Sequence, residues 1–274
     1  MSPQCQEVPL PVASAARASE TTAIHTRLLK CSLEVEESRS YWRHSAECAE
    51  RAERATPERA FEEYWFGARS LPRVKLFLTN FRARFDAFPA ALEALQRLSL
   101  LDLESRRLLC HWHLQLSDPL YRTFTGDFLH VRRNRSQPKV NRDAVITWVG
   151  DQGPGRWTMA TRIQFASKLL TAALAAGLVT SNRDPRPLSF PAIPNRTLTY
   201  LLYLLREVDF VGTLLNNPYL ASVGLVGAAL DERLRGLEGV GYRRQGENRD
   251  LSWEFANLTA WVKHVAPRLE GGCQ

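Results

Sequence analysis

The sequence predicts a mainly α-helical protein with two helical subdomains, helix-turn-helix or winged-helix-like modules and one short β-hairpin. Apolar residues recur at helical spacing along most of the 274 residues, and residues that favour helix starts precede several of these stretches. One pair of short extended segments flanks a turn typical of a hairpin. We therefore expect four regions: a disordered tail (1–20), an N-terminal helical domain (21–129), a basic linker with a winged-helix-like module (130–194) and a C-terminal helical region (195–274).

The first residues of the chain differ in composition from those that follow. Residues 1–20 are rich in Pro, Ser and Ala without helical periodicity, which is typical of a disordered or loosely docked tail. Residues 21–55 contain neither Gly nor Pro and permit helix. Thr56 and Pro57 suit the cap and the first position of a short helix that ends near Gly67.

From Ser70 the helical pattern becomes clearer. One apolar stripe consists of Val74, Phe77, Leu78, Phe81 and Phe85. The Phe88-Pro89 pair ends this helix. Similar patterns predict three more helices in this half of the chain, over residues 90–98, 103–116 and 119–128.

The central part of the chain predicts two helices and then a hairpin. A helix over 143–152 meets a forced turn at Gly153-Pro154-Gly155. Thr158 can cap a second helix, which Gly177 ends. The hairpin would follow, with extended pieces at 178–180 and 186–190 around a turn at 181–185. Winged helix-turn-helix modules use this order of elements.

The C-terminal part again predicts helices. Apolar patterns place them over residues 197–207, 221–237 and 252–265. The segment 239–250 contains Gly241, Arg243, Arg244 and Arg249, and we expect it to be a loop.

The basic residues concentrate in one segment. The chain carries a net charge of +7, yet residues 130–198 contain 11 Lys and Arg against 3 Asp and Glu, a net of +8. A segment with this excess needs counter-charge, and a nucleic-acid backbone is a common source. The alternative is a solvated basic face that keeps the protein soluble.

The predicted contact residues lie in this segment. The apolar stripe of the second helix consists of Ile163, Ala166, Leu169, Leu170, Ala173 and Leu174. It leaves Thr161, Gln164, Lys168 and Thr171 on the opposite face, with Arg162 at its flank. Such side chains can bond bases or phosphates, and no acid stands among them. The other candidates for nucleic-acid binding are Arg132, Arg133, Arg135, Lys139 and Arg142 in the linker, Arg156 and Thr158 at the helix start, and Arg183 and Arg186 in the hairpin.

A second, weaker candidate lies earlier in the chain. Residues 56–85 could form another helix-turn-helix, with Arg73 and Lys75 as contacts. Basic residues that solvate a packed helix are an equally good explanation.

Several of these segments resemble the BrxA family, the small helical proteins of bacteriophage-exclusion (BREX) systems. The similarity extends over residues 57–265, and its segments are Ser70-Leu71-Pro72-Arg73, the region from Leu120-Tyr121-Arg122 to Asp127-Phe128-Leu129, and Thr158-x-x-Thr161-Arg162 with residues 168–179. The resemblance implies a helical protein that binds duplex DNA in phage defence, beside other BREX proteins and without a catalytic site. An N-terminal extension of about 50 residues falls outside the family pattern.

Other function classes find less support in the sequence. The chain contains no G-x-S-x-G, P-loop or H-E-x-x-H motif, so we expect no enzyme and no cofactor. The cluster Cys110-His111-Trp112-His113 places two ligands on one helix face, too few for a metal site, and we expect a packed helix instead. Five scattered cysteines, no long apolar run and no secretory signal predict a cytoplasmic protein without a membrane span.

Two alternative functions stay open at this stage. The basic face could meet an acidic protein, which would make the chain an assembly subunit of a defence complex. It could also bind RNA or regulate transcription.

Overall fold

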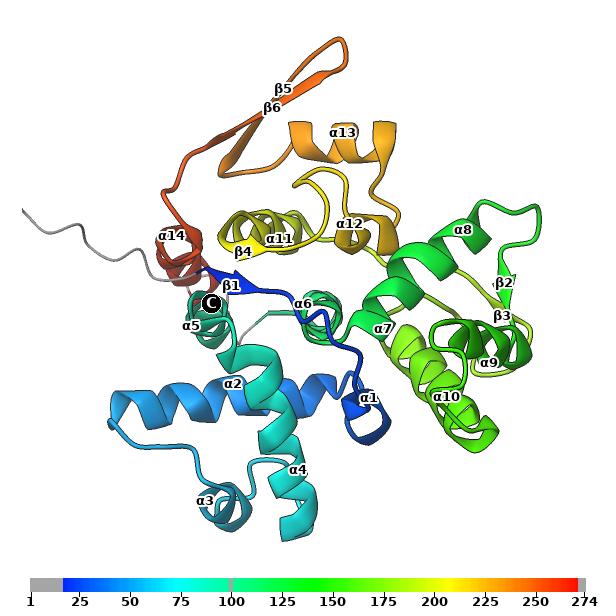
Figure 1. The fold of residues 1–274 in the computed structure, drawn as a ribbon. Coiled ribbons are helices and arrows are strands. Elements are labelled where there is room, and N and C mark those ends of the chain that lie inside the picture. The colour runs from blue at the N-terminus through cyan, green and yellow to red at the C-terminus, as the bar shows by residue number, and fades with distance from the viewer. Residues whose placement is uncertain (1–16, 99–100, 271–274) are drawn as a thin grey trace, which may run out of the picture.

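The computed structural model describes residues 17–98 and 101–270, and it confirms a mainly α-helical fold. Strands in the described part of the chain are short and form two-stranded pairs. Across these residues, no helix has both the length and the apolar character that crossing a bilayer requires. Figure 1 shows α6 near the middle of the molecule, with the remaining helices around it.

The N-terminal helices follow the predicted start signals. Thr56 caps its helix by accepting a hydrogen bond from the Arg59 amide at 3.2 Å, and Pro57 is the first helical residue. The helix from Ser70 ends in a π-helical turn, η1, before Pro89 opens the next helix. The elements are β1 (Ala18–Ser19), α1 (Arg27–Lys30), α2 (Val35–Glu50), α3 (Pro57–Glu62), α4 (Leu71–Phe81), η1 (Arg82–Asp86) and α5 (Pro89–Arg97).

The middle of the chain builds the centre of the core. Every residue of α6 from Leu108 to Ser117 is buried, so this helix lacks the single apolar stripe of a surface helix. The predicted helix over 119–128 continues further, through a second π-helical turn. The elements are α6 (Leu103–Ser117), α7 (Pro119–Thr123), η2 (Phe124–Phe128), α8 (Leu129–Arg133), β2 (Lys139–Val140), α9 (Arg142–Asp151), α10 (Met159–Ala175) and β3 (Arg186–Pro187).

The C-terminal part differs from prediction in three places. The helix expected over 252–265 begins only at Leu258, because Ser252 and Trp253 belong to strand β6. The segment expected as a loop over 239–250 is a β-hairpin, which projects from the molecule in Figure 1. The helix expected over 221–237 is interrupted at Gly224, where φ is +82°. The elements are α11 (Asn195–Glu207), β4 (Val208–Asp209), α12 (Pro218–Ser222), α13 (Gly227–Arg235), β5 (Val240–Gln245), β6 (Asn248–Trp253) and α14 (Leu258–Glu270).

The N-terminal and C-terminal parts pack directly on one another. β1 pairs with β4 in parallel, α14 lies against α5, and α11 lies against α6. Buried apolar side chains from all regions belong to one continuous cluster. The region boundaries at 129 and 194 stay a prediction.

The end of the predicted tail is not loose. Residues 1–16 lie outside the described residues, but Glu20 is buried and forms an ion pair with Arg122 at 3.4 Å. Its carboxylate also accepts hydrogen bonds from the Tyr219 hydroxyl and, at 3.1 Å, from the Val211 amide. A buried charge with these partners anchors the chain, so the tail prediction is wrong for residues 17–20.

Candidate nucleic-acid interface

The basic segment folds as α8, β2, α9 and α10, followed by a hairpin that pairs back onto β2. Lys139 pairs with Pro187 and Val140 with Arg186, and an isolated bridge joins Val179 to Leu188. The predicted hairpin over 178–190 is therefore present, and β2 adds a third extended segment beside it. The stretch 130–142, expected as a linker, contains the end of α8 and all of β2.

Capping side chains set the starts of α9 and α10. Asn141 accepts from the Ala144 amide at 3.0 Å, and Thr158 accepts from the Thr161 amide at 3.3 Å. Between the two helices Gly155 adopts a φ of +74°, which a residue without Cβ tolerates best. The caps and this turn fix the relative direction of the helices.

Arg162 lies along this turn rather than pointing outward. Its Nε donates to the Trp157 carbonyl at 3.1 Å. A Cβ atom at position 150 would lie 2.6 Å from a guanidinium nitrogen of Arg162, so Gly150 provides the space for this side chain. Arg162, predicted as a DNA contact, therefore joins α10 to the end of α9.

Apart from Arg162, α10 has the buried apolar face and the exposed polar face that the sequence predicts. Most of the predicted stripe is buried, while Ile163 and Leu174 are half-buried at its edges. On the opposite side Gln164 and Thr171 are exposed, and Thr161 and Lys168 are half-exposed. No acidic residue occurs anywhere in α10.

Arg142 and Asp184 connect α9, α10 and the hairpin. The Arg142 guanidinium donates to the Ser167 hydroxyl at 2.9 Å, which places its charge beside the outward face of α10. Asp184 accepts from the Arg142 amide at 2.8 Å and from Arg186 Nε at 2.7 Å. Burial raises the pKa of Asp184, but the hydrogen bonds from Arg186 and from the Arg142 amide outweigh burial and hold this pKa below its ordinary value.

The two arginines at the end of α8 are half-buried, and each lies over an aromatic ring. Arg132 lies over the Phe128 ring at 4.5 Å, and Arg133 lies over the Phe190 ring at 4.8 Å. Arg133 also donates to the Ser222 carbonyl of α12. Burial lowers the pKa of Arg133 to about 10. These contacts give both arginines a role in packing α8 against its neighbours.

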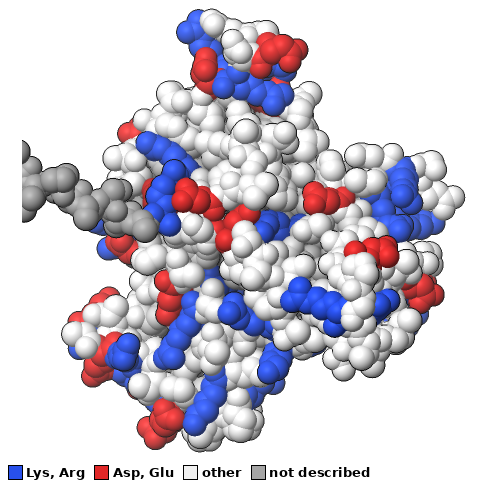
Figure 2. Space-filling view, in the orientation of Figure 1, with Lys and Arg blue, Asp and Glu red and all other residues white. Residues whose placement is uncertain are grey.

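Apart from Arg186, the other predicted cations of residues 130–198 have no carboxylate partner within 4.0 Å among the described residues. Among residues 130–198, all of which the structure describes, Arg186–Asp184 is the one ion pair within 4.0 Å. Arg156 donates to the Ile24 carbonyl at 2.7 Å, which leaves its charge uncompensated. Figure 2 shows Lys and Arg side chains over the α8 and α9–α10 part of the molecule, with fewer Asp and Glu among them. The cations without an ion pair include Arg135, Lys139, Arg142, Arg156, Lys168 and Arg183.

The weaker candidate contacts are neutralised by acids. Arg73 pairs with Glu34 at 3.2 Å, and Lys75 pairs with Glu58 at 3.4 Å. The Arg73 guanidinium also donates to the Lys30 carbonyl and lies over the Phe77 ring. These pairs join α4 to the segment before α2 and to α3. The basic residues of α4 therefore fit the alternative interpretation given above, in which they solvate a packed helix.

The histidines of α6 are fully buried. His111 lies 2.9 Å from both the Tyr121 hydroxyl and the Ser222 hydroxyl, and His113 lies 2.7 Å from the Tyr200 hydroxyl. Ser222 donates its one proton to the Tyr219 carbonyl, so it accepts from His111 and its oxygen is not activated. Within the described chain, no three His, Cys, Asp or Glu side chains gather in a way that could hold a metal ion.

The β5–β6 hairpin carries arginines that sequence reasoning placed in a loop. Asp231 of α13 pairs with Arg249 at 3.1 Å and also pairs with Arg244, while Tyr242 donates to the same carboxylate. The signal for this hairpin was the alternation of Val240 and Tyr242 before a glycine turn.

Comparison with known proteins adds a likeness in fold. No family model matches the chain, and no curated protein matches it. A crystal structure of an uncharacterized protein from Magnetospirillum magneticum is similar, with a TM-score of 0.51 and 16% sequence identity. The similarity covers 67% of this chain and 97% of the other. At this level of identity the likeness shows that the two chains share a fold.

Proposed function

We propose that this protein is a non-enzymatic component of a BREX-type phage-defence system that binds duplex DNA through residues 129–190. In this proposal the segment is a winged helix-turn-helix module in which α10 is the recognition helix. The order α8, β2, α9, α10 and hairpin supports it, as does the pairing of β2 with the returning strand.

One observation carries the proposal. The outward face of α10 has no acid, and two cations without an ion pair, Arg142 and Lys168, lie at this face. The Arg142 guanidinium donates a hydrogen bond to Ser167 beside this face, and Lys168 lies on the face itself. Elsewhere in the chain, basic side chains such as Arg69, Arg97 and Arg106 pair with glutamates. The basic module therefore retains charge that a phosphate backbone would neutralise.

The side chains divide into two groups by the DNA atoms they would meet. Gln164 and Thr171 are exposed on α10 and can bond base edges in the major groove. Arg183 lies in the exposed turn between the hairpin strands, and Lys139 lies on β2, where both would meet phosphates. We expect backbone contacts to dominate affinity.

The phage-defence setting rests on the resemblance to BrxA described above. It implies that other BREX proteins are partners of this chain. A pull-down of the purified full chain against each protein of such a system tests this part of the proposal separately from DNA binding.

Fluorescence anisotropy with labelled duplex DNA, single-stranded DNA and RNA at several salt concentrations tests the main claim. We expect duplex binding whose log Kd rises linearly with log salt, by about 0.9 for each phosphate neutralised. No duplex binding at about 50 mM salt would overturn the proposal. Stronger binding of RNA in direct competition would assign the interface to RNA. Incubation of the duplex with the protein and Mg²⁺ should leave the DNA uncut.

A further inference from the structure

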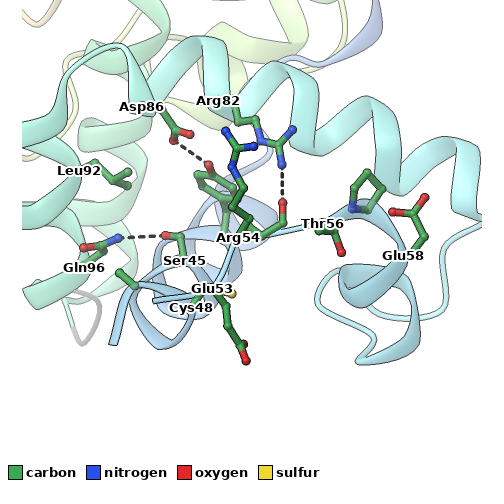
Figure 3. Close-up of a pocket in the computed structure, with 14 residues that line it drawn as sticks. Ser45, Cys48, Glu53, Arg54, Thr56, Glu58, Arg82, Asp86, Leu92 and Gln96 are labelled. Atoms are coloured by element: carbon green, nitrogen blue, oxygen red, sulfur yellow. Dashed lines mark hydrogen bonds between the residues drawn. The ribbon is translucent and has the colours of Figure 1, made fainter. Parts of the chain in front are cut away.

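A cavity of about 630 Å³ lies in the N-terminal part of the protein, away from the basic module. It opens between α2, the chain that leads into α3, η1 and α5 (Figure 3). This volume lies in the range of sites that hold small molecules, about 300–1,000 Å³. None of the predicted DNA contacts lines it.

The backbone around the cavity has two uncommon conformations. After α2 ends, Ala52 adopts a φ of +54°, which is strained for a residue with a Cβ. This residue reverses the chain, so that Glu53–Thr56 form one wall. On the opposite side η1 is a π-helical turn, a feature frequent at functional sites, and it brings Arg82 and Asp86 to the cavity.

Most of the acids that line the cavity are already neutralised. Glu53 pairs with Arg59, and Glu58 pairs with Lys75 at 3.4 Å. Asp86 accepts a hydrogen bond from the Tyr41 hydroxyl at 2.6 Å. Partial burial of the Asp86 carboxyl group raises its pKa. These contacts leave Asp86 as the one lining carboxylate without a cationic partner within 4.0 Å, among lining residues that are all described.

Two arginines of the lining are free to bind an anion. Arg54 is exposed and forms no ion pair with the described residues. Arg82 donates to the Ala55 carbonyl and also interacts with the Tyr41 hydroxyl, and its guanidinium group has no carboxylate within 4.0 Å among the described residues. In Figure 3 the Arg54 side chain extends toward Asp86, whereas the Arg82 guanidinium group is directed toward the Ala55 carbonyl. Two guanidinium groups in the lining of one cavity favour a phosphate, which accepts several charge-assisted hydrogen bonds.

The rest of the lining fits an uncharged body attached to that phosphate. Gln96 donates to Ser45 at 3.1 Å and keeps a second amide proton and its carbonyl oxygen, whereas Ser45 donates its one proton to the Trp42 carbonyl and can only accept from a ligand. Leu92 and the Tyr41 ring add apolar surface. Asp86 can accept from hydroxyl or amino groups of a ligand. A phosphate together with a ring that carries such donors is the composition of a mononucleotide.

We propose that this cavity binds a phosphate monoester of mononucleotide size, with Arg54 and Arg82 on the phosphate and Asp86, Ser45 and Gln96 on the body of the ligand. The same chemistry occurs in free nucleotides and at the 5′-phosphate end of a nucleic acid. This site does not depend on the DNA interface proposed above, because the two share no residue.

Isothermal titration calorimetry of the full chain tests the proposal. The probes are inorganic phosphate, the four ribonucleoside 5′-monophosphates, the matching nucleosides, and a short oligonucleotide with or without a 5′-phosphate. We expect at least one monophosphate to bind at least about tenfold more tightly than its nucleoside, because charged hydrogen bonds contribute most. A preference for the phosphorylated oligonucleotide would identify nucleic-acid ends as the source of the ligand.

Arg54→Gln is the test variant and Arg51→Gln is its matched control. Both residues are exposed arginines just after α2, but only Arg54 lines the cavity. We expect Arg54→Gln to weaken monophosphate binding at least about tenfold and Arg51→Gln to leave it unchanged. Lys168→Ala, in the basic module, should also leave it unchanged.

Three results would overturn this inference. They are no binding of any phosphorylated probe up to about 1 mM, equal affinity for nucleosides and their monophosphates, and equal losses in the Arg54 and Arg51 variants. Loss of binding in Lys168→Ala would move the anion site to the basic module and contradict the assignment. Thermal denaturation of each variant checks that it is folded.

Discussion

The carboxylate of Asp184 accepts a hydrogen bond from the backbone amide of Arg142, the first residue of α9, at 2.8 Å. Its other oxygen accepts from Arg186 Nε at 2.7 Å. A single side chain in the hairpin turn therefore holds that turn against the start of a helix 42 residues earlier. An anion at this helix start also interacts favourably with the helix dipole.

Replacement of Asp184 by Ala is expected to loosen the hairpin turn. Because the side chain is about one third exposed, the loss of unfolding free energy should be modest, about 0.5–1 kcal/mol. The folded pKa of Asp184 is lowered, so its contribution is present at neutral pH and is lost as pH falls below the ordinary value near 3.8. Chemical denaturation of both proteins at pH 7 and near pH 3 measures the difference. An equal difference at both pH values would contradict this account.

Removal of the two free cations Lys168 and Arg183 is expected to weaken duplex binding. Neither forms an ion pair with the described residues, so their loss should not lower thermal stability. If each neutralises one phosphate, the double Ala variant should reduce the log–log salt slope by about 1.8. Anisotropy titrations at several salt concentrations measure this slope.

Lys75→Ala is the matched control for that variant. It removes one positive charge that Glu58 already compensates. Its slope should equal that of the unchanged protein, and a reduction of about 0.9, half that of the double variant, would mean that net charge alone governs binding. Arg162 is unsuited to this comparison because its guanidinium holds the Trp157 carbonyl, so its loss would disturb the α9–α10 turn.

Acid is expected to destabilise the protein through the histidines of α6. Burial lowers the pKa of His111 and of His113 to about 3. The unfolded chain binds these protons near pH 6.5 and the folded chain does not, so stability falls as pH drops from about 6.5 toward 3. The decrease is about 1.4 kcal/mol per pH unit for each histidine. Urea denaturation between pH 7 and pH 4.5 tests this, and a constant unfolding free energy over that range would refute it.

Gly126→Ala is expected to destabilise the contact between η2 and α12. A Cβ atom at this position would lie 2.8 Å from the Cα and 2.9 Å from the carbonyl oxygen of Pro218. Because backbone atoms cannot move aside easily, we expect a loss of about 1–3 kcal/mol. Gly236→Ala is the control, since nothing lies within 4 Å of its Cβ position. Equal melting temperatures for the two variants would contradict the close approach.

The predictions that succeeded depend on a few neighbouring residues. Thr56 and Thr158 each bond an amide three residues later, and Gly177 adopts its left-handed conformation directly after α10. The apolar stripe of α10 likewise follows from helical spacing alone. Signals of this kind are complete within one or two turns of helix, so the sequence shows them directly.

The cavity was not predicted, because its lining comes from four separate segments. Tyr41 and Asp86 are 45 residues apart and meet only when α2 packs beside η1. The pairing of β1 with β4 joins positions still further apart, which explains why residues 17–20 were expected to be loose. No local pattern marks residues that come together in this way.

The sequence by itself determined the helical class, the helix starts at Thr56 and Thr158, the hairpin over 178–190 and the concentration of positive charge in 130–198. Tertiary structure alone decided which of those charges stay available. Arg73 and Lys75 have acidic partners, Arg133 packs into the protein, and Lys168 and Arg183 have no ion pair. The physical reason is that charge is a property of composition, whereas neutralisation depends on which carboxylate lies within about 4 Å after folding.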